Sequence, residues 1–145
     1  MKLEQEILVN QYGQGVISIE QLISLFEGFD EKNKRSFLAD LYCLIIQSKP
    51  QDEDIKTTIK ESGLKPTYTP CILLKKGVKG HNLMKIIELP DNELKKVLIL
   101  FITLFKIAYN RRFELEKDHS EKWWYWDLSD DKNVEKIFSL FEYDN

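Results

Sequence analysis

The C-terminal part of the chain contains no helix-breaking residue, since neither glycine nor proline occurs from Asp91 to Asn145. Within it, the run from Val97 to Ile102 is apolar at every position. Periodicity alone does not separate such a run from a buried strand, but the length of the segment and its helix-forming flanks favour a helix. A helix without a polar face belongs inside a bundle. The segment therefore predicts a long central helix.

Helix signals recur in the rest of the chain. Ser18 and Gln21 have the spacing of a capping box, in which the two side chains satisfy free backbone donors. Asp30 is placed to cap a third helix that ends before Pro50. Further helices are expected over about residues 3–12, 19–27, 52–62 and 83–87, and a last one begins after Asp130 or Asp131. No stretch has clear two-residue alternation with a turn partner.

The stretch from Gly63 to Pro70 is expected to be an ordered linker, because both of its prolines restrict the preceding residue. Thr69 is predicted to cap a short helix with Pro70 in its first turn. Residues 77–80 have the composition of a flexible loop. The linker either crosses between two halves of the bundle or forms a rigid contact edge whose low entropy favours binding.

These elements predict an all-α single domain over residues 1–145, with six to eight helices and an acidic C-terminal helix at about 130–143. The length of 145 residues and the 43% apolar content suit one compact core. The most apolar stretch, Val97–Ala108, is shorter than the ~20 residues that span a bilayer. The N-terminus has no secretory signal, so we expect a cytoplasmic protein that does not bind membranes.

Composition and spacing exclude several kinds of chemistry. The formal charge of −3 argues against general nucleic-acid binding. Cys43, Cys71, His81 and His119 have no metal-ligand spacing, so neither a metal nor another cofactor is expected. The cysteines are expected to be buried free thiols, although spacing alone leaves a disulfide open. No glycine-flanked nucleophile or phosphate loop is present, which makes an enzyme the less favoured class.

An arginine pair, Arg111 and Arg112, allows two interpretations. On a helix, Arg112 can pair with Glu116, and Arg111 can reach Glu114 or Leu115 across one turn. If the two side chains instead face a cleft with His119, they are shaped to grip an anionic ligand.

Four consecutive aromatic residues, Trp123, Trp124, Tyr125 and Trp126, cannot all face inward from a helix. They are expected to pack onto the central helix with at least one ring partly exposed, where exposed rings would be protein-binding anchors. The segment from Asp127 to Asn145 has a balance of −4, against +1 for residues 1–126. Its candidate partner-binding acids are Asp127, Asp130, Asp131 and Glu135. These acids suit a basic protein partner, or else form an ordinary solvated helix.

The string Gly-Leu-x-Pro-Thr-x-Thr-Pro at residues 63–70, followed by Ile-Leu-Leu at 72–74, resembles a family of uncharacterised bacterial proteins known only as a domain of unknown function. The likeness extends over most of the chain and includes Gly28-Phe29-Asp30, Arg111-Arg112 and Trp123-Trp124. The resemblance implies a small, helical, cytosolic bacterial protein and brings no activity or catalytic residues with it.

The sequence thus favours a non-enzymatic protein-binding module. Its most concrete form is an immunity-type protein that covers the cationic active site of a bacterial toxin with residues 123–143. The alternative is a small-molecule regulator or an enzyme whose anionic ligand is held by the arginine pair. A structural role within a larger assembly is the third reading, and the oligomeric state is left open.

Overall fold

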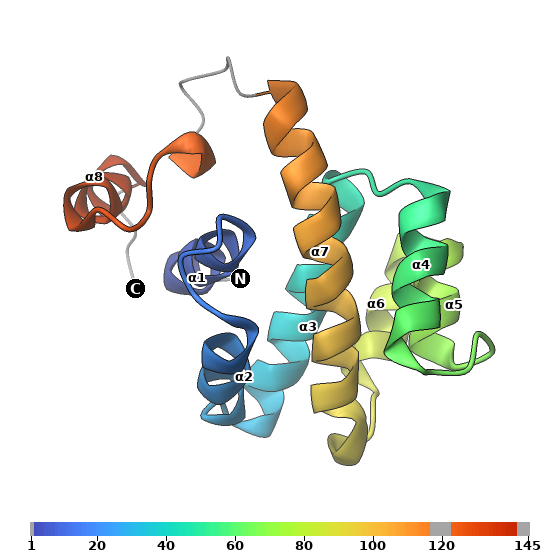
Figure 1. The fold of residues 1–145 in the computed structure, drawn as a ribbon. Coiled ribbons are helices and arrows are strands. Elements are labelled where there is room, and N and C mark those ends of the chain that lie inside the picture. Colours follow the sequence, from blue (N-terminus) through green and yellow to red (C-terminus); the bar gives the residue numbers. More distant parts are fainter. Residues whose placement is uncertain (1, 117–122, 142–145) are drawn as a thin grey trace.

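The computed structural model describes residues 2–116 and 123–141, and all of their regular structure is helical (Figure 1). The helices are α1 (Leu3–Gly13), α2 (Ile19–Glu27), α3 (Glu31–Gln47), α4 (Asp52–Ser62), α5 (Thr69–Lys75), α6 (Lys79–Ile87), α7 (Leu94–Glu116) and α8 (Asp131–Phe141). Two single 3-10 turns, η1 (Asp91–Glu93) and η2 (Trp123–Tyr125), complete the described elements. The prediction of an all-α bundle is confirmed for this part of the chain.

Helix α7 is the centre of the bundle, as its apolar sequence predicted. Most side chains from Leu94 to Tyr109 are buried, and nearly all of the buried ones belong to the main core. Helices α1, α2 and α8 lie on one side of α7 and α4, α5 and α6 on the other, while α3 packs along it (Figure 1). One stripe of α7 remains open, because Ile99 is 37% exposed. The helix is therefore central without being buried all round.

The predicted caps hold the ends of the helices. Ser18 Oγ accepts from the Gln21 amide at 3.1 Å, and the Ser18 amide donates to Gln21 Oε1 at 2.7 Å. Asp30 Oδ1 accepts from the Asn33 amide at 2.8 Å at the start of α3. Helix α4 ends at Gly63, whose φ of 73° is in the left-handed region that favours glycine. These local signals were readable because each depends on residues close in sequence.

The segment at residues 77–80 differs from the flexible loop that its composition predicted, because α6 already begins at Lys79. The reason is Asn82, which is only 3% exposed. Its amide nitrogen donates to Tyr42 Oη at 2.7 Å and to the carbonyl of Lys76 at 3.2 Å. These bonds join α6 to α3 and α5. Tertiary hydrogen bonding thus overrides the local glycine signal.

Helix α5 also begins differently from the prediction. Tyr68 is the residue before the helix, and Thr69 is its first residue rather than its cap. The Tyr68 hydroxyl donates to Glu93 Oε2 at 2.6 Å, which ties the start of α5 to the turn before α7. The Tyr68 side chain is half-buried as a result.

Helix α8 is attached through a separate, small core. This core contains Leu3 and Ile7 from α1 together with Leu128 and Ile137, all at most 3% exposed. The predicted acidic C-terminal helix therefore exists, with its described part at Asp131–Phe141. Among the described helices, none combines the length and the apolarity needed to cross a membrane.

Candidate functional site

We call residues 124–126, which overlap the turn η2, the aromatic segment. Hydrogen bonds to its backbone hold it in place. Gln14 Nε2 donates to the carbonyls of Trp124 at 2.5 Å and Trp126 at 2.8 Å. The same side chain accepts from the Leu128 amide through Oε1 at 3.3 Å. Gln14 follows directly after α1. One side chain therefore fixes three backbone groups within residues 124–128 against the end of α1.

Tyr109 supports the same segment from α7. Its hydroxyl donates to the Trp124 carbonyl at 2.9 Å, and burial raises the pKa of Tyr109 to about 12. A Cβ atom on Gly13 would lie 2.7 Å from the Tyr109 ring, so the absence of a side chain there lets α1 approach α7. Gln11 adds a bond from Nε2 to the Leu128 carbonyl at 3.1 Å. The segment is thus fixed by α1 and α7 together.

A row of aromatic rings connects α7 with this segment. Phe113 lies 6.1 Å from Tyr109 and 4.9 Å from Tyr125 between ring centroids, the latter in an edge-to-face arrangement. Trp124 and Tyr125 are 5.9 Å apart. Edge-to-face pairs add specific attraction to the area that they bury. The expected packing on the central helix is therefore observed for Trp124 and Tyr125, while Trp126 packs against the small core of Leu3, Ile7, Leu128 and Ile137.

The rings of the segment are nevertheless not sealed inside. The side chains of Trp124, Tyr125 and Trp126 are each half-buried. Lys136 Nζ lies 4.9 Å from the centre of the Trp126 ring, within cation–π range. The side chain of Trp123 lies outside the described part of the chain. Each of these three side chains therefore keeps part of its surface exposed to solvent.

The four acids of the sequence-derived candidate site lie beside these rings and are exposed: Asp127, Asp130, Asp131 and Glu135. Asp127 accepts from the Ser129 amide at 3.0 Å and from Ser129 Oγ at 2.5 Å, and these bonds lower the pKa of its carboxyl. Asp130 precedes α8 and accepts from the Lys132 amide at 2.9 Å. No ion pair engages these four carboxylates within the described residues. Their charge is therefore available to solvent or a partner.

The two arginines have different partners. Arg111 forms a bidentate pair with Asp54 of α4, with Nη2 at 3.1 Å from Oδ1 and Nη1 bonded to Oδ2. The predicted reach of Arg111 to Glu114 or Leu115 is therefore wrong, because α4 packs alongside α7 and brings a carboxylate closer. Arg112 donates to the Gln47 carbonyl at the end of α3. The side chain of Glu116 and the whole of His119 lie outside the described residues.

Both arginine side chains also border an open pocket of about 230 Å³ at the corner between α3 and α4. Lys49 lies at the same pocket and has a φ of 51°, in the left-handed region that is uncommon for lysine. The structure thus brings a third cation to the arginine pair. Lys49 was not among the residues that the sequence singled out, because nothing local links it to a segment 62 residues later.

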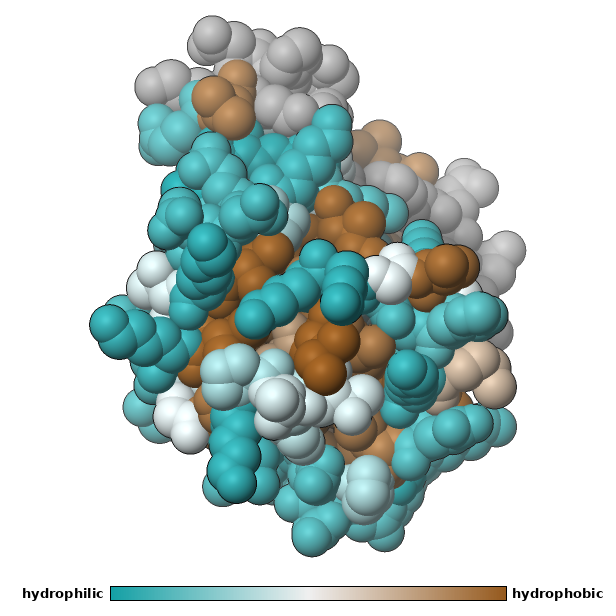
Figure 2. All heavy atoms as spheres, turned by 90° about the vertical axis from the view of Figure 1, so that its right-hand side faces the viewer, coloured by the Kyte–Doolittle hydropathy of each residue, from teal (hydrophilic) through white to brown (hydrophobic). Residues whose placement is uncertain are grey.

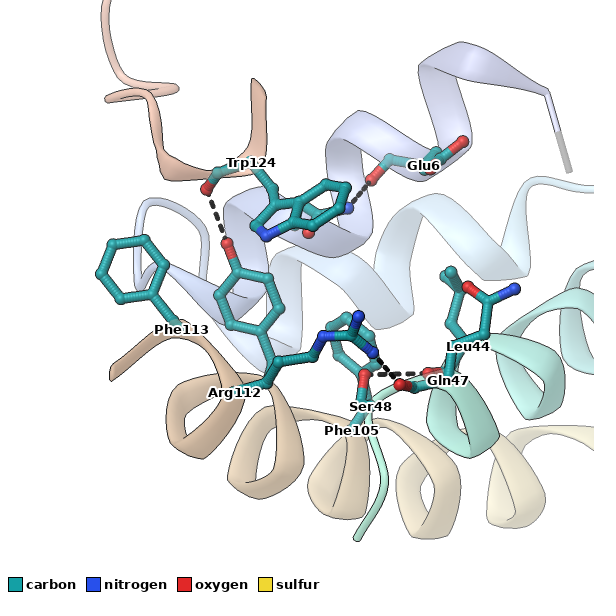
Figure 3. Close-up of a pocket in the computed structure, with 10 residues that line it drawn as sticks. Glu6, Leu44, Gln47, Ser48, Phe105, Arg112, Phe113 and Trp124 are labelled. Carbon is teal, nitrogen blue, oxygen red and sulfur yellow. Dashed lines mark hydrogen bonds between the residues drawn. The ribbon is translucent and has the colours of Figure 1, made fainter. Parts of the chain in front are cut away.

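A smaller cavity of about 90 Å³ lies beneath the aromatic segment (Figure 3). The Trp124 indole covers one side of it, and Arg112 extends below toward Gln47 (Figure 3). Drug-sized ligands need roughly 300–1,000 Å³. Burial raises the pKa of Glu6, which also borders the cavity. The cavity has room only for water or a very small ligand.

Titratable groups elsewhere form no cluster of metal ligands within residues 2–116 and 123–141. Cys43 and Cys71 are free thiols, the first half-buried and the second fully buried. Burial raises the pKa of the Cys71 thiol, which makes it less reactive.

The residues that position the aromatic segment were missed by the sequence analysis. Neither Gln11 nor Gln14 was singled out from the sequence, yet both bind a segment more than 100 residues away. A weak signal exists in hindsight, since two amide side chains lie one turn apart beside the close-packing Gly13.

Comparisons with known proteins give the chain a family but no activity. No curated protein and no solved structure matches it. One family model matches residues 4–127, a range that begins at the second residue of α1, contains α2 through α7 and the aromatic segment, and ends before α8. The chain therefore belongs to the family of unknown function DUF5958.

Proposed function

We propose that this chain is a non-enzymatic protein-binding module of the bacterial cytoplasm, and that it neutralises a basic toxin in the manner of an immunity protein. The binding surface is the aromatic segment together with the acids Asp127, Asp130, Asp131 and Glu135. One observation carries the proposal: rings that are half exposed belong to a backbone fixed from within by Gln14 and Tyr109. Anchors that are already ordered lose little entropy when a partner binds.

The charge of this surface supports a basic partner. The four acids are exposed and unpaired by cations within the described residues, while tryptophan and tyrosine are the residues that most often dominate interface energies. Acidic surroundings accelerate encounter with a cationic protein, and rings supply the buried area that keeps it bound. A toxin whose active site binds an anionic polymer has such a cationic surface.

Growth rescue tests the proposal directly. Cells that produce cationic toxin domains encoded beside genes of this family are expected to survive when this chain is co-produced. Trp126→Ala and Glu135→Lys are expected to abolish or weaken rescue. Glu20→Lys is the matched control, because Glu20 is an exposed acid on α2 that lies outside the proposed surface.

Association kinetics separate the electrostatic contribution from the aromatic one. With a purified toxin domain, Glu135→Lys is expected to slow association by about threefold to tenfold at low salt, and Trp126→Ala mainly to speed dissociation. Equal effects of Glu135→Lys and Glu20→Lys, or the absence of rescue for every toxin domain tried, would contradict the proposal.

A second candidate function is the binding of a small anion by Lys49, Arg111 and Arg112. The observation that favours it is the shared pocket of these three cations. In a thermal-shift assay, phosphate, nucleotides and small carboxylates are the probes. Stabilisation that disappears in Arg112→Ala but persists in Lys106→Ala would favour this function, and no shift with any probe would exclude it.

A further inference from the structure

An apolar groove lies between α4 and α5, on the side of α7 opposite α8 (Figure 1). Ile55, Ile59 and Leu64 contribute its apolar lining, and two open cavities of about 470 and 250 Å³ follow one another along it. Lys56 and Lys75 border both cavities, which makes them one continuous groove. Figure 2 faces this side of the molecule and shows apolar surface at its centre, ringed and partly crossed by hydrophilic side chains.

The groove lies in the most basic part of the chain. Residues 55–87 contain seven lysines and a single acid, Glu61. Within the described residues, only one of these lysines has an ion-pair partner: Lys56 lies 3.7 Å from Glu53 of its own helix. The acids in the first turn of α4 reduce this charge at the smaller cavity, where Asp52 is part of the lining and Lys56 pairs with Glu53. At the larger cavity, Lys60 and Lys75 have no ion-pair partner within the described residues.

One end of the groove is bordered by a stiff piece of chain. Gly63 and Pro66 belong to the linker that the sequence singled out, and they border the larger cavity. Ser62 Oγ accepts from the Leu64 amide at 3.1 Å and donates to the Ile59 carbonyl at 2.6 Å, which fixes the exit from α4. The groove is thus formed before any partner arrives, which lowers the entropic cost of binding.

We propose that this groove binds an acidic segment of a second protein. One or two large apolar side chains of that segment enter between α4 and α5, and its carboxylates meet Lys60, Lys65 and Lys75. This site is separate from the proposed toxin-binding surface, so the chain binds two proteins of opposite charge on opposite sides. The proposal does not depend on the identity of the toxin.

The shape of the groove distinguishes this partner from other anions. Ile55 and Ile59 are 6% and 3% exposed, so they are recessed and cannot insert into a lipid surface. The cavity linings contain neither an aromatic ring nor an arginine, the groups on which nucleic-acid bases stack. A recessed aliphatic floor with a cationic rim instead matches an amphipathic acidic peptide.

Fluorescence anisotropy with the full chain tests this inference. The probe is a labelled peptide in which leucines alternate with pairs of glutamates, and its matched control carries serine in place of each leucine. The leucine peptide is expected to bind, with affinity that falls as salt rises, and the serine peptide to bind at least about tenfold more weakly, since losing buried leucine contacts costs over ~1.4 kcal/mol.

Two lysine-to-glutamate substitutions locate the binding site. Lys60→Glu is expected to weaken binding of the leucine peptide by about fivefold or more. Lys32→Glu makes an equal charge change at an exposed position of α3 and is expected to leave binding nearly unchanged. Glu135→Lys, at the proposed toxin-binding surface, is also expected to have little effect, which separates failure of this inference from failure of the proposed function.

Several outcomes would overturn the inference. Equal weakening by Lys60→Glu and Lys32→Glu would show attraction by net charge alone. Equal binding of the two peptides, with competition by a single-stranded oligonucleotide or by phosphatidylserine vesicles, would make the groove a general polyanion site. Self-association of the chain in sedimentation that disappears in Lys60→Glu would make a second copy the occupant.

Discussion

At the residue scale, Gln14 shows how much of the candidate site depends on a single uncharged side chain. It satisfies two carbonyl groups and one amide of the segment that carries Trp124 and Trp126. Buried or half-buried carbonyls without a donor cost more than the hydrogen bond itself contributes. The position of the aromatic rings therefore depends on a residue that makes no contact with a partner in the proposed function.

Replacement of Gln14 tests this dependence. We expect Gln14→Ala to lower the free energy of unfolding of the aromatic segment by about 1–3 kcal/mol, because the carbonyls of Trp124 and Trp126 lose a shared donor. The measurement is acrylamide quenching of tryptophan fluorescence together with urea unfolding. Gln47→Ala is the control, since the Gln47 side chain makes no hydrogen bond within the described residues. Equal quenching of both variants would contradict the role of Gln14.

Thr58 is a buried residue whose hydroxyl group lowers the stability of the fold. Its side chain is 1% exposed, and its hydroxyl has no hydrogen-bond partner within the described chain. We expect Thr58→Val to raise the free energy of unfolding by about 1 kcal/mol, because a buried hydroxyl without a partner is replaced by a methyl group. Thr103→Val is the control, because that hydroxyl donates to the Ile99 carbonyl at 2.7 Å. Chemical denaturation of both variants provides the comparison, and a destabilised Thr58→Val would refute the expectation.

Tyr109 makes the stability of the chain sensitive to alkaline pH. Burial raises its pKa to about 12 from an ordinary value of 10.0, so the folded state favours the neutral phenol. This contribution to stability is fully present below pH 10, the unfolded value, and is lost as pH rises toward about 12. We expect the free energy of unfolding to fall over that window. Tyr109→Phe is expected to reduce the slope of this free energy against pH, and to lower the free energy itself by about 1 kcal/mol at neutral pH. Urea titrations at several pH values measure both, and an unchanged slope in the variant would count against the assignment.

At the scale of elements, α8 differs from the other helices because it is held by a core of its own. Leu3, Ile7, Leu128 and Ile137 form this core, whereas the main core is centred on α7. Local opening requires only that the smallest cooperative unit loses its contacts. We therefore expect α8 to open before the helices of the main core.

We expect hydrogen exchange to reveal this order. Amides of α8 should exchange faster than those in the middle of α7, and Ile137→Ala should lower the protection of α8 by about 2–4 kcal/mol while leaving α7 nearly unchanged. Ile137 is fully buried in the small core, which is why its truncation acts there. Equal loss of protection in both helices would mean that they form one cooperative unit.

The elements also show what sequence reasoning reached and what it did not. The caps at Ser18 and Asp30 and the glycine stop at Gly63 were predicted, because each depends on residues within one turn. The start of α6 was missed, because Asn82 gains its bonds from α3 and α5, and no local pattern contains that information. Hydrogen bonds between residues distant in sequence are thus found at both helix starts that departed from prediction, those of α5 and α6.

The candidate site was predicted to a similar extent. The aromatic segment and its acids could be named, since ring clusters and charge runs are visible in the sequence. The partners of Arg111 and the role of Gln14 could not, because both depend on how α1, α4 and the aromatic segment pack beside α7. Sequence thus named the candidate residues of the aromatic segment and missed those that hold them in place.

At the scale of the whole molecule, all three tryptophans lie within residues 123–126, at one end of the bundle. Their fluorescence reports the aromatic segment, whereas far-ultraviolet circular dichroism reports all helices. We therefore expect the fluorescence transition in urea to come at a lower midpoint than the dichroism transition, because the small core opens before the main one. Ile137→Ala should widen the gap. Coincident transitions in the native chain would show that the two cores unfold together.

The grip on the aromatic segment has an evolutionary consequence. The hydrogen bonds that Gln14, Gln11 and Tyr109 make with residues 124–128 all involve peptide groups. Any amino acid supplies the same peptide oxygen, so the hydrogen bonds to this backbone tolerate substitutions of the side chains at these positions. Side chains at 124–126 can therefore change in evolution without loss of the hydrogen bonds that hold this segment in place.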